Sequence, residues 1–356
     1  MFTSQPFATL STTQIPPRYS VIIPVFNRPD ELQELLQSLS SVMKSPPERL
    51  TNAYELTEII VVEDGSEVTS ERVCRRFEKN LNIRYLQQKN AGPAAARNTG
   101  ARAAKGDWLI FFDSDCVIPE GYFDAVTSAL SQKGVDFYGG PDRASTDFTA
   151  TQKAIDYTMT SFFTTGGIRG GERNLDRYYP RSFNMGIRKM CFEDVGGFSS
   201  LRFGEDLELS MRLHAAGFRS RLLKDAWVYH KRRTDLIKFF KQVYNSGMAR
   251  VVLNQLHPHT MKPLHLLPSL FVLYLAIAIL LLPSGTTVPW YPIGLLILIL
   301  FMDAYRRMKN ISASLRVPPA AFCQLCGYGL GLLHAWVLIH LFRRKEPRAF
   351  EKTFYK

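Results

Sequence analysis

An apolar run that ends in two closely spaced carboxylates limits what this chain can fold into. Residues 108–112 are uniformly apolar, and Asp113 and Asp115 follow with only Ser114 between them. A short apolar run of this kind predicts a buried strand, and open α/β sheets bind ligands beyond the carboxyl ends of their strands. Carboxylate oxygens suit Mg²⁺ or Mn²⁺. The pattern therefore predicts a metal that holds a nucleotide, although Asp-x-Asp also begins calcium loops and solvated turns.

The N-terminal third alternates between strand-like and helical segments. Helices are predicted to open near Pro29, to run through Arg76 and to cover 93–104, and strands are predicted at 19–25, 58–62, 83–87 and 108–112. This alternation predicts right-handed crossovers and a mainly parallel sheet. We therefore expect an α/β fold.

A set of further motifs occurs in a fixed order. The motifs are Ser-Val-Ile-Ile-Pro-Val-Phe-Asn at 20–27, Val-Val-Glu-Asp-Gly-Ser at 61–66, Gly-Pro-Ala-Ala-Ala-Arg-Asn-Thr-Gly at 92–100, Asp-Ser-Asp at 113–115, Asn-Met-Gly-Ile-Arg at 184–188, Gly-Gly-Phe at 196–198 and Gly-Glu-Asp-Leu-Glu-Leu at 204–209. In this order they resemble the family-2 glycosyltransferases, over about residues 18–235. The resemblance implies the GT-A fold, a Rossmann-like α/β domain that binds a nucleotide-sugar.

The resemblance also implies a nucleotide-sugar site. Its expected residues are Pro24, Asn27, Glu63, Asp64, Arg97, Asn98, Asp113, Ser114 and Asn184. Pro24 and Asn27 would line the nucleotide pocket, and Asp64 would accept a hydrogen bond from a base N–H. Glu63 departs from the family, which usually has Asp at this position. Read without the resemblance, the segment 64–66 is an ordinary turn.

Arg97 and Asn98 lie in a predicted helix of small residues. Arg97 would be a cation near the phosphates or the base, able to make forked hydrogen bonds; the alternative is a solvated helix arginine. Asn184 is expected to face the sugar or the acceptor.

An inverting transfer needs a base that takes a proton from the acceptor hydroxyl. A further carboxylate, remote in sequence from Asp113 and Asp115, is therefore expected. Glu205 and Asp206 supply it, and the resemblance makes Asp206 the candidate base, with Glu205 second. Alternatively, both acids only interact with the dipole at the start of a helix.

His230 follows a strand-like run at 226–229 and is the third expected metal ligand, beside Asp113 and Asp115. A neutral imidazole suits Mn²⁺ better than Mg²⁺, but a lone histidine can also be structural. The basic run at 231–233 would bind a diphosphate or anionic lipid headgroups. Between residues 139 and 181 the alternating pattern is lost, which is typical of acceptor-side loops.

Three apolar stretches follow, at 264–282, 290–302 and 320–342. A spanning helix needs about 20 mainly apolar residues, so the first and third qualify by length. The second qualifies only if flanking residues such as Val288 and Asp303 lie at the membrane interfaces. The alternative is buried helices of a large soluble core. The linker at 283–289 is expected to be a tight external turn.

Basic residues flank these stretches at Lys262, 306–309 and 343–345. Under the positive-inside rule, three full spans cannot place all of them on one side. Either the third stretch is re-entrant or interfacial, or the C-terminus breaks the rule. The first two stretches predict a cytoplasmic catalytic domain at a cell inner membrane, and 1–17 lacks the features of a signal peptide.

The predicted organisation is a flexible N-terminus at 1–17, a GT-A domain at 18–250, a juxtamembrane linker at 251–263, two or three membrane helices at 264–342 and a basic tail at 343–356. The formal net charge of +12 fits lipid and diphosphate partners, and basic clusters beside apolar stretches favour lipid over nucleic acid. Five scattered cysteines provide no disulfide framework.

We therefore expect a metal-dependent, inverting glycosyltransferase of a membrane-anchored bacterial type. It would move a sugar from a nucleotide-diphosphate-sugar to a glycan or lipid-linked acceptor in surface polysaccharide synthesis. One alternative is a polyprenyl-phosphate glycosyltransferase, whose nucleophile needs no strong base. A processive synthase would carry Gln-x-x-Arg-Trp where this chain has His-Lys-Arg-Arg-Thr at 230–234. A catalytically silent membrane scaffold is the alternative from another class.

Overall fold

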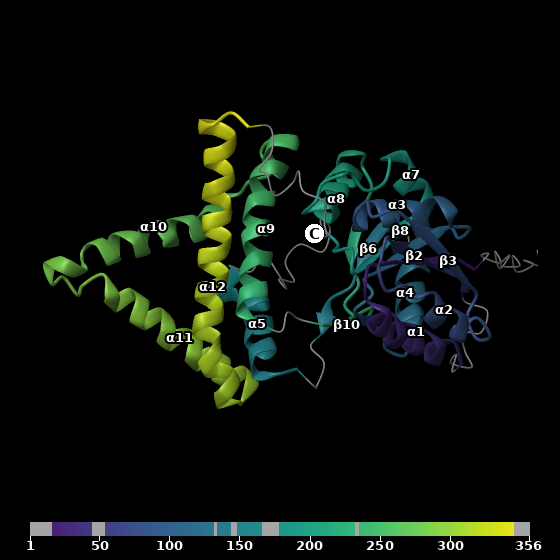
Figure 1. Ribbon diagram of the computed structural model, residues 1–356, viewed down its shortest axis with the longest axis horizontal. Helices are drawn as coiled ribbons and strands as arrows, with labels where there is room; N and C mark the ends of the chain where they lie inside the picture. Colours follow the sequence, from purple (N-terminus) through teal and green to yellow (C-terminus); the bar gives the residue numbers. More distant parts are fainter. Residues whose placement is uncertain are drawn as a thin grey trace, which may run out of the picture.

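The computed structural model describes residues 16–44, 54–131, 134–143, 148–165, 178–231 and 235–344. They form an α/β sandwich joined to a group of long helices (Figure 1). Four sets of predictions lie wholly or partly outside the described residues: those on 1–15, on the acceptor-side segments 144–147 and 166–177, on Arg232 and Arg233, and on the part of the tail at 345–356.

The sandwich is built on a seven-stranded sheet with the order β3-β2-β1-β4-β8-β6-β9. Its strands are β1 (Arg18–Val25), β2 (Glu55–Asp64), β3 (Ile83–Gln88), β4 (Trp108–Phe112), β6 (Phe137–Gly139), β8 (Asn184–Arg188) and β9 (Ser220–Leu222). β8 runs antiparallel to its neighbours β4 and β6, and the other neighbouring strands are parallel. The predicted mainly parallel α/β sheet is confirmed.

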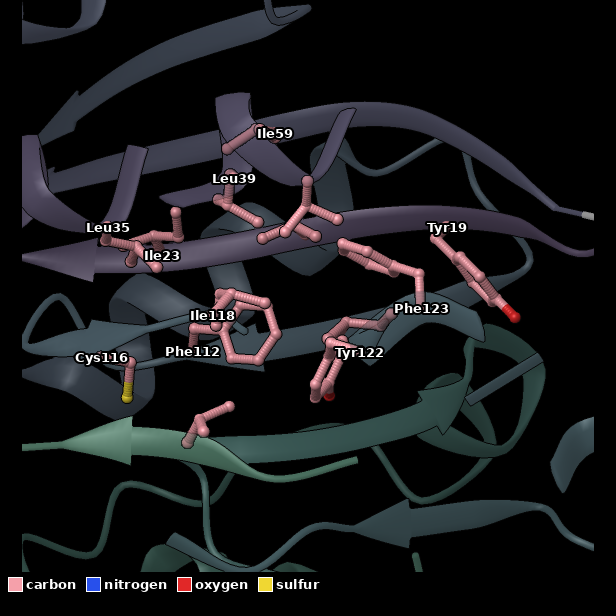
Figure 2. Close-up of a cluster of buried hydrophobic side chains, with 14 of the residues drawn as sticks. Tyr19, Ile23, Leu35, Leu39, Ile59, Phe112, Cys116, Ile118, Tyr122 and Phe123 are labelled. Atoms are coloured by element: carbon pink, nitrogen blue, oxygen red, sulfur yellow. The ribbon is translucent and has the colours of Figure 1, made fainter. Parts of the chain in front are cut away.

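Helices cover both faces of this sheet. One face is covered by α1 (Pro29–Lys44), α2 (Glu71–Phe77) and α4 (Tyr122–Ser131), and the other by α3 (Pro93–Ala103), α7 (Lys189–Asp194) and α8 (Glu205–Ala215). Figure 2 shows the first of these cores, where Leu35 and Leu39 of α1 lie on the side of Ile23 of β1, and Phe123 of α4 stacks near Tyr19 toward the other end of the strand. Central strands buried on both faces explain why β1, β2 and β4 read as continuous apolar runs.

A small sheet of three strands lies at the edge of the sandwich. It has the order β5-β10-β7 and comprises β5 (Cys116–Val117), β7 (Asp142–Arg143) and β10 (Val228–His230). His230 is the register partner of Cys116 across an antiparallel pair. This pairing brings a residue from late in the sequence beside the acids that follow β4.

The remaining helices form a group beside the sandwich. They are α5 (Ala150–Thr160), α6 (Phe162–Thr165), α9 (Leu236–Leu256), α10 (Leu267–Leu280), α11 (Trp290–Met308) and α12 (Ile311–Trp336), with short helical segments at Pro263–Leu266, Leu282–Ser284 and Val337–Leu341. α9 runs through residue 250 without a break, so the predicted linker does not begin at 251. The linker prediction is wrong there because α9 packs along α12 over this stretch.

Two stretches among the described residues are long and apolar enough to cross a membrane. They are Pro263–Ser284 and Ile311–Leu341, with mean hydropathies of 2.5 and 1.5. α11, which contains the second predicted stretch, does not qualify because Asp303, Arg306 and Arg307 lie in its last turns.

Candidate active site

Arg97 forms ion pairs with two acids that lie far apart in the sequence. It lies on α3, is 3% exposed, and places Nη2 2.6 Å from Asp113 Oδ1 and Nη1 3.1 Å from Glu205 Oε1. Asp113 follows β4, whereas Glu205 begins α8. The structure therefore brings the Asp-x-Asp motif and the Gly-Glu-Asp motif together, and Arg97 is not a solvated helix residue.

Asp115 belongs to a second cluster beside the first. Its Oδ2 accepts a hydrogen bond of 2.9 Å from Arg28 Nη1, and its Oδ1 lies 3.2 Å from His230 Nε2. Burial alone would raise the pKa of Asp115, but His230 and Arg28 hold it well below the usual range. Burial alone would lower the pKa of His230, but Asp115 and Asp142 raise it to about 9.

The donor set around Asp115 fits a divalent ion with oxygen and nitrogen ligands. Ligand atoms of Asp115, Cys116 and His230 lie within 4.8 Å of one another. Burial, and then the charges of Asp115 and Asp113, raise the pKa of the Cys116 thiol well above its usual value, and only a thiolate binds metal well. A carboxylate and an imidazole remain, which suit Mn²⁺.

Asp113 is not part of this ligand cluster among the described residues. Its carboxylate is instead engaged by Arg97 and is 32% exposed. The predicted set of three metal ligands is thus split in this structure: Asp115 and His230 are adjacent, and Asp113 faces the arginine.

The acid pair at the start of α8 points in two directions. Glu205 meets Arg97, whereas Asp206 lies 3.4 Å from Arg181 Nη1. Burial, and then the neighbouring charge of Asp206, raise the pKa of Glu205 to about 7, although Arg97 opposes the shift. Both residues make contacts outside their own helix, so they do more than interact with the helix dipole.

The loops after β1 and β2 are held by the residues predicted to contact the nucleotide. Asn27, in the left-handed region at φ 52°, accepts hydrogen bonds from Glu67 N and Val68 N through Oδ1, at 2.8 and 3.1 Å. Asp64 accepts from Ala91 N and Gly92 N at 2.9 and 2.8 Å and is 2% exposed. Asp64 therefore organises the loop before α3, and the hydrogen bond that it is expected to accept from a base N–H stays a prediction.

Glu63 is likewise internal. It is 2% exposed, and its Oε2 accepts hydrogen bonds from Ser70 N and Tyr85 Oη at 2.6 and 3.0 Å. Its oxygens accept hydrogen bonds from groups of the protein itself, and its expected contact with the nucleotide stays a prediction.

Two predicted asparagines are structural in this arrangement. Asn184 is fully buried, donates to Ala226 O at 2.8 Å and accepts from Tyr122 Oη at 2.7 Å, and its expected contact with the sugar or the acceptor stays a prediction. Asn98 donates to Phe198 O and accepts from Phe198 N, at 2.7 and 2.9 Å. These bonds fix the loop between α7 and α8 against α3, which bears Arg97.

Pro24 and Ser114 lie close to the edge where the acids gather. Pro24 pairs with Val62 near the carboxyl end of β1 and is half-buried. Ser114, between the two acids, is 5% exposed. Position alone keeps both among the candidate donor-site residues.

Two arginines of the site were missed by the sequence analysis. Arg28 follows Asn27, and the pairing of β1 with β4 could have placed it near Asp115. Arg181 offered no signal, since it precedes β8 in a segment without periodicity.

A family model named "Glycosyl transferase family 2" matches residues 20–196, the segment that contains the site from Asn27 to Asn184. The chain belongs to glycosyl transferase family 2. This family-2 chain is 30% identical over 206 residues to the Glycosyltransferase AglE of Haloferax volcanii, which covers 57% of the chain and 63% of that relative. It is 24% identical over 221 residues to the Minor teichoic acid biosynthesis protein GgaB of Bacillus subtilis, covering 61% of the chain and 23% of the relative. The chain thus spans less than two thirds of the length of either relative.

Among solved structures, this family-2 chain resembles the mannosyltransferase PcManGT from Pyrobaculum calidifontis, in complex with GDP-Man and Mn²⁺. The TM-score is 0.61 at 16% sequence identity, over 87% of this chain and 88% of that one. The likeness shows a shared fold and confirms the GT-A prediction.

Proposed function

We propose that this transferase moves a sugar, with inversion, from a nucleotide-diphosphate-sugar to a lipid-linked acceptor at the cytoplasmic face of a membrane. One observation carries the proposal: Arg97 joins Asp113, on the Asp-x-Asp side, to Glu205, in the acid pair of α8. A transfer reaction needs a leaving-group site and a base in one place, and this contact unites the two candidates.

The donor side is assigned to Asp115, His230, Arg28 and Arg97. Asp115 and His230 would hold Mg²⁺ or Mn²⁺, which when bound would neutralise charge on the diphosphate leaving group. Arg28 and Arg97 are positioned to place further positive charge at the same edge of the sheet. The solved mannosyltransferase of the same fold was obtained with GDP-Man and Mn²⁺, which supports a metal-dependent donor of this class.

Asp206 is assigned as the base. Glu205 is 3.1 Å from Arg97, whereas the contact of Asp206 with Arg181 is longer, at 3.4 Å. Because the shorter contact holds Glu205 on the buried Arg97 guanidinium, Asp206 is the acid of the pair that we assign to receive the proton of the acceptor hydroxyl. Glu205 would then set the position of Arg97 rather than take the proton.

The acceptor is assigned from what packs beside the acid pair. Gly204 immediately precedes Glu205, and a side-chain carbon placed on it would lie 3.3 Å from Leu253 and 3.5 Å from Ala249 of α9. α9 in turn packs along α12, one of the two apolar stretches. The acids thus lie one helix layer from the apolar helices, where a lipid-linked acceptor would present its reacting group.

Measurements of donor binding and of turnover test the donor assignment and the base assignment separately. Thermal unfolding is measured with a panel of nucleotide-sugars, with and without Mn²⁺, because a ligand of the folded state raises its apparent stability. Sugar transfer to lipid-linked acceptors is then measured for Asp206→Asn, with Asp194→Asn, an exposed acid of α7, as the matched control.

We expect Asp206→Asn to keep donor binding and to lose turnover by roughly 10²- to 10⁴-fold, while Asp194→Asn stays near wild type. If Asp206→Asn transfers at the wild-type rate to a polyprenyl phosphate, the base assignment fails and the lipid-phosphate reaction replaces it. If no nucleotide-sugar shifts the unfolding temperature, the donor assignment fails.

A further inference from the structure

α9 contacts the catalytic sandwich near its C-terminal end. It begins after Asp235, and its first turn is capped by the bond from Lys238 N to Asp235 Oδ1. Near its C-terminal end Leu253 packs on Gly204, and His257 Nε2 lies 3.1 Å from Glu208 Oε1. The last turns of α9 are therefore held against α8 of the sandwich.

α12 runs beside α9 in the same direction. Leu236 of α9 packs near Cys323 of α12, and fifteen positions further on Val251 packs near Leu332 and Ile339. The residue numbers rise together along both helices, so the two are parallel. From 323 to 339 the shared length is about 24 Å at 1.5 Å per residue.

The backbones of α9 and α12 touch through glycines. A side-chain carbon on Gly247 would collide with the Tyr328 carbonyl oxygen, and one on Gly331 would collide with the Tyr244 carbonyl oxygen. Gly327 and Gly331 form a Gly-x-x-x-Gly pair, which permits such close approach of helices. The two helices therefore share one orientation relative to any membrane.

That shared orientation prevents α12 from crossing a bilayer. A spanning α12 would carry α9 into the hydrocarbon, together with the exposed Lys238 and Lys241 and the part of the sandwich that contacts Leu253 and His257. Charged side chains in the bilayer centre are costly. α12 also bonds to polar groups along its length, since Gln324 donates to Thr164 O and His334 pairs with Tyr244 Oη.

The α10–α11 hairpin, residues 263–308, is the part that leaves this layer. The start of α10 contacts α12, with Pro268 and Val272 against Gly329 and Phe271 against Phe322. α11 returns to α12 with Leu300 and Ala304. Figure 1 shows the hairpin projecting from α12 on the side opposite the sandwich.

The projecting surface of the hairpin is apolar and exposed. No Lys, Arg, Asp or Glu occurs from 263 to 302. Its side chains that are at least half exposed include Leu270, Ile277, Ile279, Leu280, Leu282, Val288, Tyr291, Leu295 and Leu298. An apolar surface of this extent marks a contact with a protein or a membrane, and the basic residues next to it favour the membrane.

The returning arm of the hairpin is too short to cross a bilayer. The apolar part of α11, residues 290–302, spans about 20 Å, against about 30 Å for the hydrocarbon core. The next residue, Asp303, is fixed at the base by Tyr157 Oη at 2.5 Å and Arg307 Nε at 2.9 Å. The exposed basic residues near the hairpin all lie outside its uncharged part, 263–302. They are Lys262, Arg306, Arg307, Lys309, Arg343 and Arg344.

We propose that the α10–α11 hairpin enters a lipid bilayer from the catalytic side and turns back inside it, while α9 and α12 lie parallel to the bilayer surface at its base. This arrangement places every basic cluster in the described residues on one side. It resolves the conflict that three full spans would create with the positive-inside rule. The inference concerns how the chain sits in lipid and holds whichever donor and acceptor the site uses.

Cysteine labelling from each side of the membrane tests the arrangement. In the full chain with Cys323 and Cys326 replaced by Ser, single cysteines are introduced as Glu78→Cys on the sandwich, Ser312→Cys and Arg344→Cys at the two ends of α12, and Thr287→Cys at the hairpin tip. All four positions are exposed. A membrane-impermeant maleimide is applied to intact host cells and to sealed inside-out vesicles, and detergent-solubilised protein gives the total.

We expect Ser312→Cys and Arg344→Cys to label on the same side as Glu78→Cys, and Thr287→Cys to label only in detergent. Labelling of Ser312→Cys and Arg344→Cys on opposite sides would show that α12 spans and would overturn the proposal. Labelling of Thr287→Cys from the side opposite Glu78→Cys would do the same for the re-entrant hairpin. If Glu78→Cys labels in intact cells, the cytoplasmic orientation in the proposed function is wrong, but the relative sides still decide this inference.

A depth measurement checks the tip independently. Bimane attached at Thr287→Cys is placed in dioleoylphosphatidylcholine vesicles that contain phosphatidylcholine brominated at acyl carbons 11 and 12. We expect these deep bromines to quench the dye at least twofold more strongly than a headgroup-attached spin label. Stronger quenching from the headgroup would overturn insertion of the tip.

Discussion

Arg97 Nη2 lies 2.6 Å from Asp113 Oδ1, and the guanidinium that makes this contact is almost completely buried. The second nitrogen of the fork reaches Glu205. Asp113 follows β4, Arg97 lies on α3 and Glu205 begins α8, so one side chain links the Asp-x-Asp motif to the acid pair of α8. A buried ion network of this kind is sensitive to the loss of one partner.

Arg97→Met is expected to destabilise the protein by about 3 kcal/mol, because it leaves Asp113 and Glu205 as uncompensated buried or half-buried acids. Arg97→Lys keeps the charge but lacks the planar fork, so it should fold better than Arg97→Met and still lose most turnover. Arg18→Met, which breaks the exposed ion pair with Asp107, serves as control and should cost less than about 1 kcal/mol. Denaturant unfolding in detergent micelles measures all three; equal losses for Arg97→Met and Arg18→Met would contradict the network.

The raised pKa of Glu205 predicts that the free energy of unfolding depends on pH. Its pKa in the folded state is raised to about 7, first by burial and then by the charge of Asp206. A raised pKa means that the folded state favours the protonated acid, so the stabilisation is complete below the unfolded value and is lost as the pH rises through 7.

Glu205→Gln should therefore gain stability relative to wild type between pH 5 and pH 8. Unfolding temperatures measured across that range, with Glu193→Gln as an exposed control, give the comparison. A difference between Glu205→Gln and wild type that does not change with pH would contradict the shifted pKa.

The central strands and the positions of the acids could be predicted from the sequence because both follow from local pattern. β4 is five buried apolar residues, and a residue after such a strand lies at the sheet edge whatever the rest of the chain does. The roles of Asp64 and Asn184 could not be predicted in this way. Their hydrogen-bond partners, Gly92 N and Ala226 O, are distant in sequence, and no local signal distinguishes a carboxylate that holds a loop from one that meets a base.

The apolar stretches show the same limit. Hydropathy finds 263–284 and 311–341, but it does not say that the second lies against α9. That information resides in Gly247, Gly327 and Gly331, which the sequence analysis did not use. Small residues matter here because they let two backbones approach, and their partner can be known only from the fold.

His230 predicts that protons compete with the metal. Its pKa is raised to about 9 through Asp115 and Asp142, against the effect of burial, so at neutral pH the imidazole is protonated and must lose its proton to coordinate an ion. In protein stripped of metal by a chelator, the His230–Asp115 pair should stabilise the folded state fully below pH 6.5. This stabilisation should be lost as the pH rises through 9.

Mn²⁺ affinity should accordingly rise with pH between 6.5 and 9 and be accompanied by proton release. Titration calorimetry in two buffers of different ionisation enthalpy measures the released proton. His230→Gln should abolish the release and weaken binding about tenfold or more, whereas His259→Gln, outside the site, should do neither. A pH-independent affinity in the wild type would oppose His230 as a ligand.

We predict that the seam, the close packing of α9 against α12 at Gly247, supports the active site. A side chain there has no room against the Tyr328 carbonyl and the Leu332 amide, so Gly247→Val should destabilise the protein by about 1–3 kcal/mol through overpacking. Because α9 also packs on Gly204, turnover should fall more steeply than donor binding. Gly294→Val is the matched control, since nothing lies within 4 Å of a side-chain carbon at Gly294 of α11, and it should leave both nearly unchanged. Thermal unfolding and transfer rates measured together test the link, and a Gly247→Val protein that unfolds earlier but keeps its turnover would separate the seam from the site.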